Sequence, residues 1–377
     1  MSFVPMEDLG INQKVVVPIQ TRPFSDVAGS YTYFADGDVL LAKITPCFEN
    51  GKLGIAENLV NGIGFGSSEF MVFRSNTSLS KEWLYYYLSR ETFRLEGAER
   101  MTGAVGHKRV AKEFIEPYPI PLPPLPEQHR IVAILDEAFD GIATAKANAE
   151  KNLQNAHTLF ESHLQAVFSQ SGNGWISNKL NSITTKIGSG ATPKGGEESY
   201  KTEGTSLIRS LNVHDMEFKY AKLAYLDDAQ AAGLANVEIQ QLDVLLNITG
   251  ASVARCCLVP DNVLPARVNQ HVSIIRPVMN KILPEFLHYL LISKPYKDKL
   301  LQTGEEGGST RQAITKAQIQ DFTVKYPATI QEQKLIIAKI DAVLTETQRL
   351  ESIYQQKIAA LDELKKSLLH QAFSGHL

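Results

Sequence analysis

One heptad pattern, present twice in the chain, constrains the fold more than any other feature. From Glu127 to Gln170, apolar or small residues recur in alternating steps of four and three, the spacing that lines one stripe of an α-helix. Such a helix would reach about 66 Å at ~1.5 Å per residue, and no globular core buries so long and narrow a stripe. The segment therefore needs a partner helix. Its predicted seam residues are Ile131, Leu135, Ala138, Ile142, Ala145, Ala149 and Leu159.

The chain contains that partner. Adding 205 to each residue number carries 127–170 onto 332–375, which keeps the spacing without a gap. The opening Glu-Gln pair recurs, and Asp136 recurs as Asp341. The alternative is two unrelated amphipathic helices in separate domains, but the shared length, register and identities argue against it. The predicted seam residues of the second helix are Ile336, Ile340, Val343, Leu350, Tyr354, Leu361, Leu364 and Leu368.

Connectivity predicts how the two helices pair. The second helix starts where the segment after the first helix ends, so we expect an antiparallel coiled coil. Pairing about the midpoints would set Ala145 and Ala149 near Ile353, Tyr354 and Lys357, with small residues facing larger ones.

Length and composition limit the class of protein. A chain of 377 residues with 44% hydrophobic and 21% charged residues predicts two or three soluble domains. It has no run of about 18 apolar residues, and its start lacks the basic and apolar regions of a signal peptide, so no membrane association is expected. Cys47, Cys256 and Cys257 form no Cys-x-x-Cys pattern, which favours a reducing cytoplasm over a disulfide framework or a zinc site. With a net charge of −3, any nucleic-acid contact must come from local basic faces.

Two globular segments follow the same order of elements, which predicts an α+β fold with a pseudo-two-fold internal repeat. The first has predicted strands at 37–43 and 70–74, a helix at 81–99 and a glycine-opened basic loop at 103–109. The second has matching strands at 242–246 and 272–276, a helix at 284–290 and a loop at 307–312. The proline-rich residues 117–126 are expected to end the first domain and direct the first long helix, although such a run could also bind a proline-recognising domain. The predicted segments are 1–118, 119–171, 172–330 and 331–377.

The two copies differ at the front. Residues 175–207 have no counterpart in the first domain, where Phe3-Val4-Pro5 already aligns near Leu207-Ile208. The chain is therefore expected to be a shortened form or to have its true start upstream.

Several short strings, in order and duplicated, carry a resemblance to a known family. They are Pro124–Gln128 leading into Ile131-Val132, Gln371–Gly375, Gly188–Pro193, Asp243–Gly250 and Val268–Val272. With the two long helices, they resemble the specificity subunit of Type I restriction-modification systems. The departure from the family pattern is the absent front of the first domain.

The resemblance implies two target recognition domains separated by an antiparallel pair of helices. Each domain would read half of a bipartite site in double-stranded DNA, and the helices would set the spacer and dock two modification (methyltransferase) subunits. Restriction (translocase-nuclease) subunits would complete the endonuclease. An alternative is a structural scaffold with two protein-binding domains and no base readout.

The sequence predicts no catalytic, cofactor or metal site. It contains neither Asn-Pro-Pro-Tyr nor Asp-Pro-Pro-Tyr, no Walker A sequence and no complete dinucleotide fingerprint. His107 and His271 have no partners at metal-ligand spacing. We therefore expect a non-catalytic subunit.

The candidate DNA contacts are polar and basic residues in glycine-rich loops and at strand ends, where amides and cations can meet phosphates and Asn or Gln can pair with adenine. Each also has a plainer interpretation as a turn, a strand entry or a solvated loop. In the first domain the candidates are Lys43, Thr45, Asn50, Lys52, Ser67, Ser68, His107, Lys108 and Arg109. In the second they are Lys186, Ser189, Thr192, Lys194, Arg209, Asn212, Arg255, Asn269, Gln270, His271 and Arg311.

Overall fold

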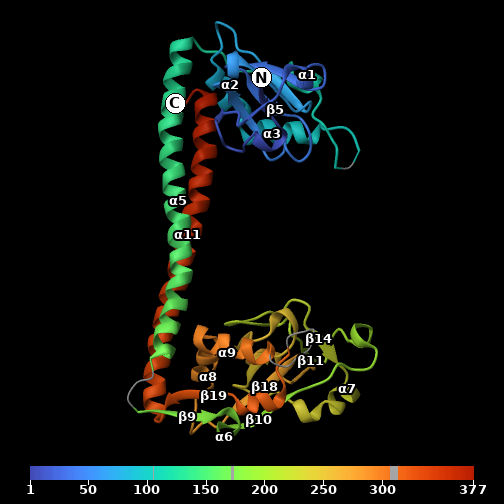
Figure 1. The fold of residues 1–377 in the computed structure, drawn as a ribbon, viewed down its shortest axis with the longest axis vertical. Coiled ribbons are helices and arrows are strands. Elements are labelled where there is room, and N and C mark those ends of the chain that lie inside the picture. The colour runs from blue at the N-terminus through green and yellow to red at the C-terminus, as the bar shows by residue number, and fades with distance from the viewer. Residues whose placement is uncertain (105, 171–173, 306–312) are drawn as a thin grey trace. The chain divides into compact units, whose positions relative to one another are not determined.

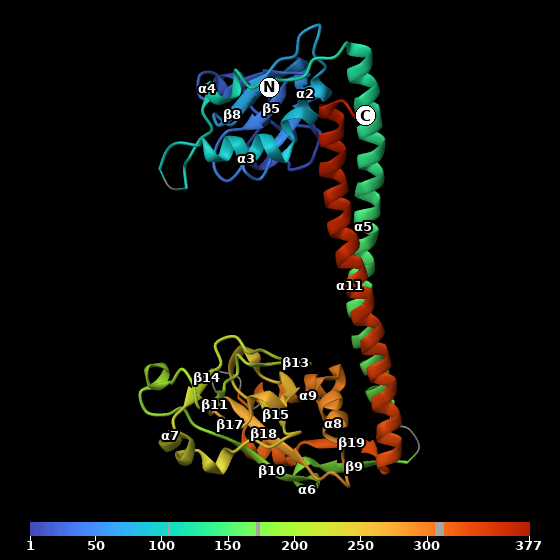
Figure 2. The same ribbon diagram turned by 180° about the vertical axis from the view of Figure 1, so that it is seen from behind.

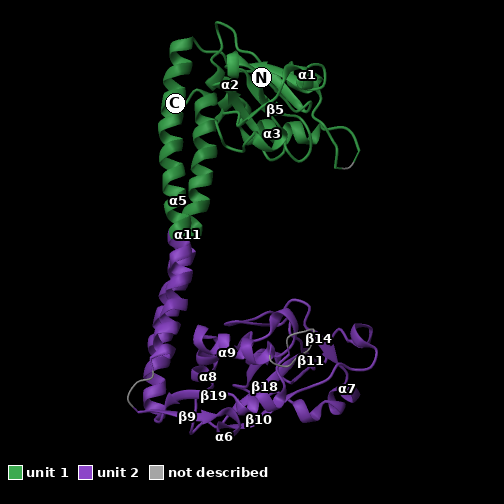
Figure 3. Cartoon of the chain, in the orientation of Figure 1, with its two compact units in different colours: residues 1–151, 354–377 green, residues 152–353 purple. Residues whose placement is uncertain are grey.

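The computed structural model describes residues 1–104, 106–170, 174–305 and 313–377. The chain divides into two compact units: Met1–Lys151 with Tyr354–Leu377 (unit 1), and Asn152–Ile353 (unit 2) (Figure 3). Two 45-residue helices, α5 (Leu125–Ser169) and α11 (Ile330–Ser374), each contribute one part to each unit. Across the described residues, no helix combines the length and the apolar character needed to cross a bilayer.

The long helices lie side by side in both views (Figures 1 and 2), which confirms the pairing predicted from the heptad spacing. Each begins two residues earlier and ends one residue earlier than predicted. In unit 1, Lys146 pairs with Asp362 at 2.7 Å, and Arg130 donates a hydrogen bond to the main-chain oxygen of Leu377 at 2.9 Å. Residue numbers rise along one helix as they fall along the other, so the pair is antiparallel.

The register of the pair differs from the centred pairing that the sequence predicts. Centred pairing would place Lys357 beside the segment around Lys146, whereas Asp362 occupies that place. The contact of His157 Nδ1 with Glu351 Oε1 at 2.8 Å gives the same register in unit 2. The shift has a physical reason: the first turn of each helix is held in a domain by a buried glutamine, described below, and therefore extends past the end of its partner.

Unit 1 carries two four-stranded sheets, with strand orders β3-β1-β7-β4 and β2-β6-β5-β8. Its strands are β1 (Ser2–Val4), β2 (Val15–Val16), β3 (Gln20–Thr21), β4 (Thr32–Ala35), β5 (Val39–Ala42), β6 (Leu53–Ala56), β7 (Ile63–Gly66) and β8 (Phe70–Phe73). Its short helices are η1 (Met6–Asp8), α1 (Phe24–Val27), η2 (Val60–Gly62), α2 (Lys81–Leu88), α3 (Glu91–Glu99) and α4 (Lys112–Ile115). Helix α2 packs on β5 and β6, and the core between them includes Trp83 of α2 and Leu135 of α5. The long helix is thus part of the core of unit 1.

The single helix predicted over 81–99 is two helices. Arg90 has an extended backbone conformation, with φ of −62° and ψ of 139°, and serves as the N-cap of α3. The Ser89 hydroxyl donates to the carbonyl of Tyr86 at 2.8 Å, which satisfies a group that a continuing helix would have bonded.

Unit 2 contains a four-stranded sheet (β10-β18-β15-β16), a three-stranded sheet (β14-β11-β17) and the pairs β12-β13 and β19-β9. Its strands are β9 (Trp175–Lys179), β10 (Thr184–Ser189), β11 (Thr205–Ile208), β12 (Val213–His214), β13 (Glu217–Phe218), β14 (Ala224–Leu226), β15 (Val244–Asn247), β16 (Cys256–Leu258), β17 (Ala266–Val268), β18 (Val272–Pro277) and β19 (Thr323–Pro327). Its short helices are α6 (Leu180–Ile183), η3 (Gly196–Ser199), α7 (Asp228–Gly233), η4 (Ala235–Val237), η5 (Gly250–Ser252), η6 (Asp261–Val263), α8 (Pro284–Ile292), α9 (Lys294–Glu305) and α10 (Lys316–Asp321). Helix α8 packs on β15, β16 and β18, as α2 packs on the sheet of unit 1.

Strands β5 and β15 are counterparts in the repeated scaffold. Each follows a buried aspartate that forms a two-point ion pair with an arginine at the end of the neighbouring strand. Asp38 pairs with Arg74 and Asp243 with Arg276, in each case with a shortest distance of 2.7 Å. Each carboxylate also accepts a main-chain N–H from three residues upstream at 2.7 Å. The ion pair therefore fixes the start of the equivalent strand in both units.

Candidate nucleic-acid interface

In unit 1 the basic loop after α3 folds back onto the end of β5. Arg109 forms isolated β-bridges with Ile44 and with Thr102. The main-chain N–H of Thr45 donates to the carbonyl of Lys108 at 2.9 Å, and its hydroxyl donates to the same oxygen at 3.0 Å. The structure thus brings Thr45 together with Lys108 and the neighbouring His107, although they lie far apart in sequence.

Arg109 and Glu69 form a two-point ion pair beside this loop. The shortest contact joins Nη2 and Oε1 at 2.6 Å, and the Glu69 main-chain oxygen accepts the N–H of Lys43 at 2.9 Å. The hydrogen bond from Arg109 lowers the pKa of the Glu69 carboxyl, and the charge of Lys43 acts in the same direction. Glu69 follows Ser67 and Ser68 in the turn between β7 and β8. Because Arg109 is already paired, the exposed Lys108 is better placed to meet an incoming phosphate.

Two further candidates of unit 1 lie outside this arrangement. The Lys52 ammonium group donates to the carbonyls of Met6 and Glu7 at 2.7 and 3.4 Å, so it holds the first turn of the domain rather than facing a ligand. Asn50 is exposed in the turn that follows Pro46, whose carbonyl accepts its main-chain N–H at 2.9 Å.

In unit 2 four polar side chains from three segments form one hydrogen-bonded chain. The Thr192 hydroxyl donates to Gln270 Oε1 at 2.5 Å, and Gln270 Nε2 donates to His271 Nε2 at 3.1 Å. His271 Nδ1 then lies 2.5 Å from the Thr249 hydroxyl. Gln270 is exposed, so the chain holds an amide in one orientation with part of its donor and acceptor capacity facing solvent. Such an amide suits recognition of an adenine edge.

Asn212 and Asn269 were predicted as contacts, and their burial corrects that prediction. Asn212 is fully buried; its Oδ1 accepts the N–H of Arg209, and its Nδ2 donates to the carbonyl of Lys219 at 2.8 Å. Asn269 is 4% exposed, and its Oδ1 accepts the N–H of His271 at 3.0 Å. Both amides stabilise turns. Asn269, through its bond to the His271 N–H, also supports the turn that carries the exposed Gln270.

The remaining candidate residues of unit 2 differ in whether their side chains are already hydrogen-bonded within the protein. Arg209 is bonded to Glu197 Oε1 at 2.6 Å and to the carbonyl of Lys222 at 2.7 Å, with 11% of its side chain exposed. The Lys186 ammonium group donates to the carbonyl of Asn236. The other candidates are the exposed Ser189 and Lys194, the half-buried Arg255, and Arg311, which lies outside the described residues.

The helix seam follows the predicted residues and then departs from them at one equivalent position in each helix. Leu159 and Leu364 are 50% and 47% exposed, so both are wrong as seam residues. A straight α-helix drifts by about 20° per heptad relative to a 3.5-residue repeat. The less exposed positions are accordingly Phe160 and Lys365, one residue further along, which are both of intermediate exposure. Of the other predicted seam residues, Ile131, Leu135, Ile142, Ala149 and Ile340 are buried. Those of intermediate exposure are Ala138, Ala145, Ile336, Val343, Leu350, Tyr354, Leu361 and Leu368.

A buried glutamine near the start of each long helix anchors that helix in its domain. Gln128 accepts the N–H of Ser80 at 2.9 Å and donates to the carbonyls of Ser78 and Pro123, both at 2.8 Å. Sequence reasoning noticed the repeated Glu-Gln pair but gave it no role.

Gln333 forms the matching anchor in unit 2. It accepts the N–H of Leu283 at 2.8 Å and donates to the carbonyls of Lys281 and Pro327 at 2.9 and 3.0 Å. Thr249 was not among the predicted contacts either, although its position two residues after the buried strand β15 was the available signal.

A second anchor lies two helical turns further along each long helix. The hydroxyl of Tyr86 donates to Asp136, which also forms an ion pair with Lys14 at 2.6 Å. In unit 2 the hydroxyl of Tyr289 donates to Asp341 at 2.6 Å. The sequence repeat of these aspartates thus corresponds to a repeated contact between helix and domain.

Comparison with known proteins adds to this geometry. The family model described as "Type I restriction modification DNA specificity domain" matches residues 11–154 and 174–360. The Type I restriction enzyme EcoAI specificity subunit of Escherichia coli is 41% identical over 133 residues, which are 35% of this chain and 23% of that protein. The chain spans less than two thirds of the length of the curated relatives it matches.

Two solved structures share the fold. A chain from a structure of the type I R-M system superposes with a TM-score of 0.80 at 21% identity, covering 100% of this chain and 92% of the other. The HsdS subunit from Thermoanaerobacter tengcongensis superposes with a TM-score of 0.66 at 20% identity, covering 100% and 90%. Since the family model matches most of its length in two successive copies, the chain belongs to the family of Type I restriction-modification DNA specificity subunits.

Proposed function

We propose that this chain recognises a bipartite site in double-stranded DNA, with one half read by each β-rich domain, residues 1–118 and 172–330. The carrying observation is that two copies of one scaffold present different polar side chains at the same place. The loop that pairs with Ile44, just beyond β5, contains Lys108, whereas the equivalent segment beyond β15 holds Thr249 in contact with His271. A constant scaffold with variable side chains at one strand end suits two readers of different half-sites.

The paired helices are proposed to set the spacer between the half-sites and to dock two modification subunits, which supply the methyltransferase activity. Restriction subunits would complete the endonuclease. The proposal gives this chain no catalytic step. Support comes from the anchors at Gln128 and Gln333, whose hydrogen bonds hold the first turns of each helix to its domain.

The test measures the binding of DNA by the full chain assembled with its modification subunits. The DNA is a duplex that carries the site methylated by this complex. Lys108→Ala should weaken binding on all sequences and lower the salt slope of log K by about 1, because one phosphate contact is lost. Gln270→Ala should instead relax selection at one half-site by about 1–3 kcal/mol. Lys52→Ala is the matched control, since it removes a charge that is already bonded within unit 1. Unchanged affinity, salt slope and selectivity for the first two variants would refute base reading and favour a purely structural scaffold.

A further inference from the structure

The two units share a tyrosine–aspartate contact but differ in the cation beside it. In unit 1 the Lys14 ammonium group lies 2.6 Å from Asp136 and 5.1 Å from the ring centroid of Tyr86, whose hydroxyl donates to the same carboxylate. In unit 2 Tyr289 donates to Asp341 at 2.6 Å, but Asp341 has no cation within ion-pair distance among the described residues. One carboxylate of the matched pair is therefore neutralised within the chain, and the other is not.

The residue of unit 2 that corresponds to Lys14 is Phe218. Strands β1 and β11, which precede these two residues, occupy equivalent places beside β7 and β17. Asn12 and Met216 lie two residues before Lys14 and Phe218, and both have a left-handed backbone, with φ of 58° and 64°. Phe218 is buried and packs in the core of unit 2. Unit 2 therefore does not supply, from this position, the cation that unit 1 uses.

A second carboxylate of unit 2 also lacks the lysine found in unit 1. The Lys81 ammonium group of α2 lies 2.8 Å from Glu57 and 3.8 Å from Glu82. Helix α8 has Pro284 and Glu285 at the positions of Lys81 and Glu82, counted from the tyrosine that contacts the long helix. In the part of unit 2 that the structure describes, Glu285 has no cation partner. Unit 2 thus has both acids, with apolar residues in place of both lysines.

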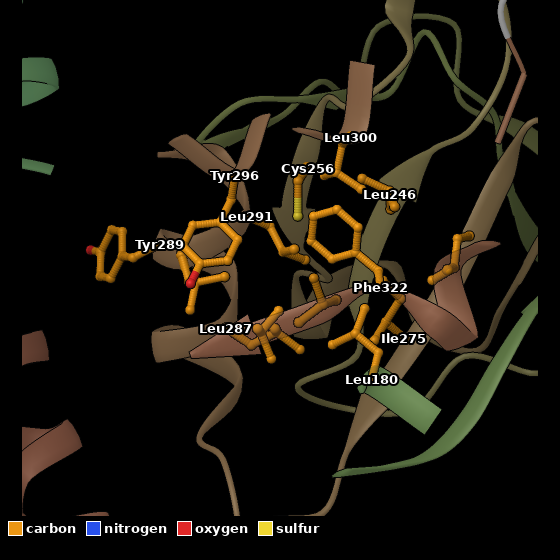
Figure 4. Close-up of a cluster of buried hydrophobic side chains, with 14 of the residues drawn as sticks. Leu180, Leu246, Cys256, Ile275, Leu287, Tyr289, Leu291, Tyr296, Leu300 and Phe322 are labelled. Carbon is orange, nitrogen blue, oxygen red and sulfur yellow. The ribbon is translucent and has the colours of Figure 1, made fainter. Parts of the chain in front are cut away.

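Both carboxylates line one pocket of about 410 Å³ together with the rings of Phe218, Tyr220 and Tyr289. Tyr289 lies at the margin of the buried cluster in Figure 4, and its hydroxyl oxygen points away from the other labelled side chains. Burial raises the pKa of Tyr289, so the hydroxyl stays protonated and donates to Asp341. Burial lowers the pKa of His288, which also lines the pocket, to about 4, so this ring is neutral at pH 7. Among the described residues, the lining contains no lysine or arginine.

These groups have the chemistry of a site for an ammonium or guanidinium group. Carboxylates bind such a cation through charge-assisted hydrogen bonds, and aromatic rings attract it. A third lining carboxylate, Glu217, adds negative charge, although Lys219 lies 3.6 Å from it. The pocket would repel a DNA phosphate, so it is separate from the candidate DNA contacts. Within the described residues, no group of side chains is arranged to hold a metal ion. The expected ligand is therefore an organic cation.

We infer that this pocket of unit 2 binds one lysine or arginine side chain of a protein docked along α11. A partly exposed ion pair is too weak to hold a free ammonium compound even at millimolar concentration, so the cation belongs to a larger docked surface. The inference rests on the proposed function, in which the docked protein is a modification subunit. Its cation takes the place that Lys14 has in unit 1, with its charge facing Asp341 and Glu285.

The test measures the affinity of the full chain for the modification subunits by titration calorimetry. Asp341→Asn removes the charge but keeps an oxygen for the Tyr289 hydroxyl, and it should weaken assembly by about tenfold and reduce its salt dependence. Glu346→Gln makes the same change of charge on the same helix. Because Glu346 is already paired with Arg349 at 2.6 Å, this control should change the affinity by less than about twofold.

A second variant tests whether the pocket takes a cation. Phe218→Lys gives unit 2 the lysine that unit 1 has, and it should weaken assembly about as much as Asp341→Asn because the pocket is then filled from within. Should Phe218→Lys fail to fold, chemical labelling of the complex replaces it. One lysine or arginine of the modification subunit should resist acetylation or phenylglyoxal with the unaltered chain and react with Asp341→Asn.

Four results would overturn the inference. Unchanged assembly with Asp341→Asn would refute the pocket and leave the proposed function intact. Equal weakening by Glu346→Gln would show a general attraction of charges along α11. Tight binding of free putrescine by the chain alone would mean that the ligand is a small molecule. Failure of the unaltered chain to bind modification subunits would refute the proposed docking role, and with it the partner named here.

Discussion

The two units are built on one scaffold but differ in what they attach to it. Gln128 and Gln333 make the same three kinds of hydrogen bond, and the ion pairs of Asp38 and Asp243 fix equivalent strands. In contrast, the ends of β5 and β15 present different side chains. Among the described residues, β18 pairs with a further strand, β10, whereas β8 pairs with β5 alone. Units 1 and 2 therefore share the buried polar anchors where helix and domain must keep a fixed geometry, while their exposed strand ends differ.

Loss of either glutamine anchor should have the largest effect. Gln128→Leu and Gln333→Leu each remove the hydrogen bonds of one main-chain N–H and two carbonyls, and we expect each to destabilise its own unit by about 4 kcal/mol. Urea unfolding can be followed by fluorescence of Trp83 in unit 1 and Trp175 in unit 2, the two tryptophans of the chain. The exposed Gln331→Leu is the control. A loss below about 1 kcal/mol in one unit only would show that the anchors are not equivalent.

Strand β18, which pairs with β10, and strand β8, which pairs with β5 alone in the described residues, should respond differently when a side chain is truncated to alanine. Ile275→Ala removes a fully buried side chain and should cost unit 2 about 3 kcal/mol. Phe73→Ala removes a larger but half-buried side chain and should cost unit 1 only about 1 kcal/mol. Equal losses in the same unfolding assay would mean that β8 is as well covered as β18.

Acid should weaken unit 2 through a residue that unit 1 lacks. Burial lowers the pKa of His288 from 6.5 to about 4, and its Nε2–H donates to the carbonyl of Cys256 at 3.2 Å. Below pH 6.5 the unfolded chain takes up a proton that the folded chain excludes, so stability falls as the pH drops towards 4. We expect a loss of about 2 kcal/mol between pH 7.5 and 5.

His288→Gln should remove that pH dependence from the unfolding of unit 2. The equivalent position in unit 1 is Tyr85, so the unfolding of unit 1 should not change its pH profile with this variant. A wild-type profile that stays flat between pH 7.5 and 5 would contradict the burial of a neutral imidazole.

The smallest difference in stability between the two units should come from the tyrosine–aspartate hydrogen bonds that join each long helix to its domain. Asp136 keeps its ion pair with Lys14 when Tyr86→Phe removes one hydrogen bond, so we expect a loss of about 1 kcal/mol. Tyr289→Phe removes a bond to Asp341, which has no cation partner among the residues that the structure describes, and should cost about 2 kcal/mol. In the double variant Lys14→Met with Tyr86→Phe, the loss in unit 1 should rise to match unit 2; if it does not, the ion pair is not what compensates.

Sequence periodicity predicted the long helices and their antiparallel pairing, because a stripe of apolar residues has few ways to be buried. It also predicted two of the strands in each domain, which correspond to β5, β8, β15 and β18. Two of its predicted seam residues, Leu159 and Leu364, are exposed, because an α-helix drifts by about 20° per heptad from a 3.5-residue repeat. The predicted register of the two long helices was wrong. The register depends on how the side chain of Gln128 bonds to a loop that is distant in sequence, which helix periodicity does not contain.

The candidate interface was predicted in part. Residue spacing could not show that Thr45 contacts Lys108, or that Thr192 contacts Gln270, although each of these residues was a predicted DNA contact. Asn269 shows the opposite case, because a short amide beside a strand is equally compatible with a buried turn and with an exposed contact. Only the packing around such a residue separates these outcomes.

Reading of a bipartite site is tested most directly by the methylation pattern of DNA from cells that express the full chain with the modification subunits proposed as its partners. Residues 175–330 are replaced by the corresponding domain of another specificity subunit, and methylated sites are mapped across the genome. One half of a bipartite methylated motif should change, while the other half and the spacer stay the same. An unchanged motif, or a change in both halves at once, would contradict this prediction.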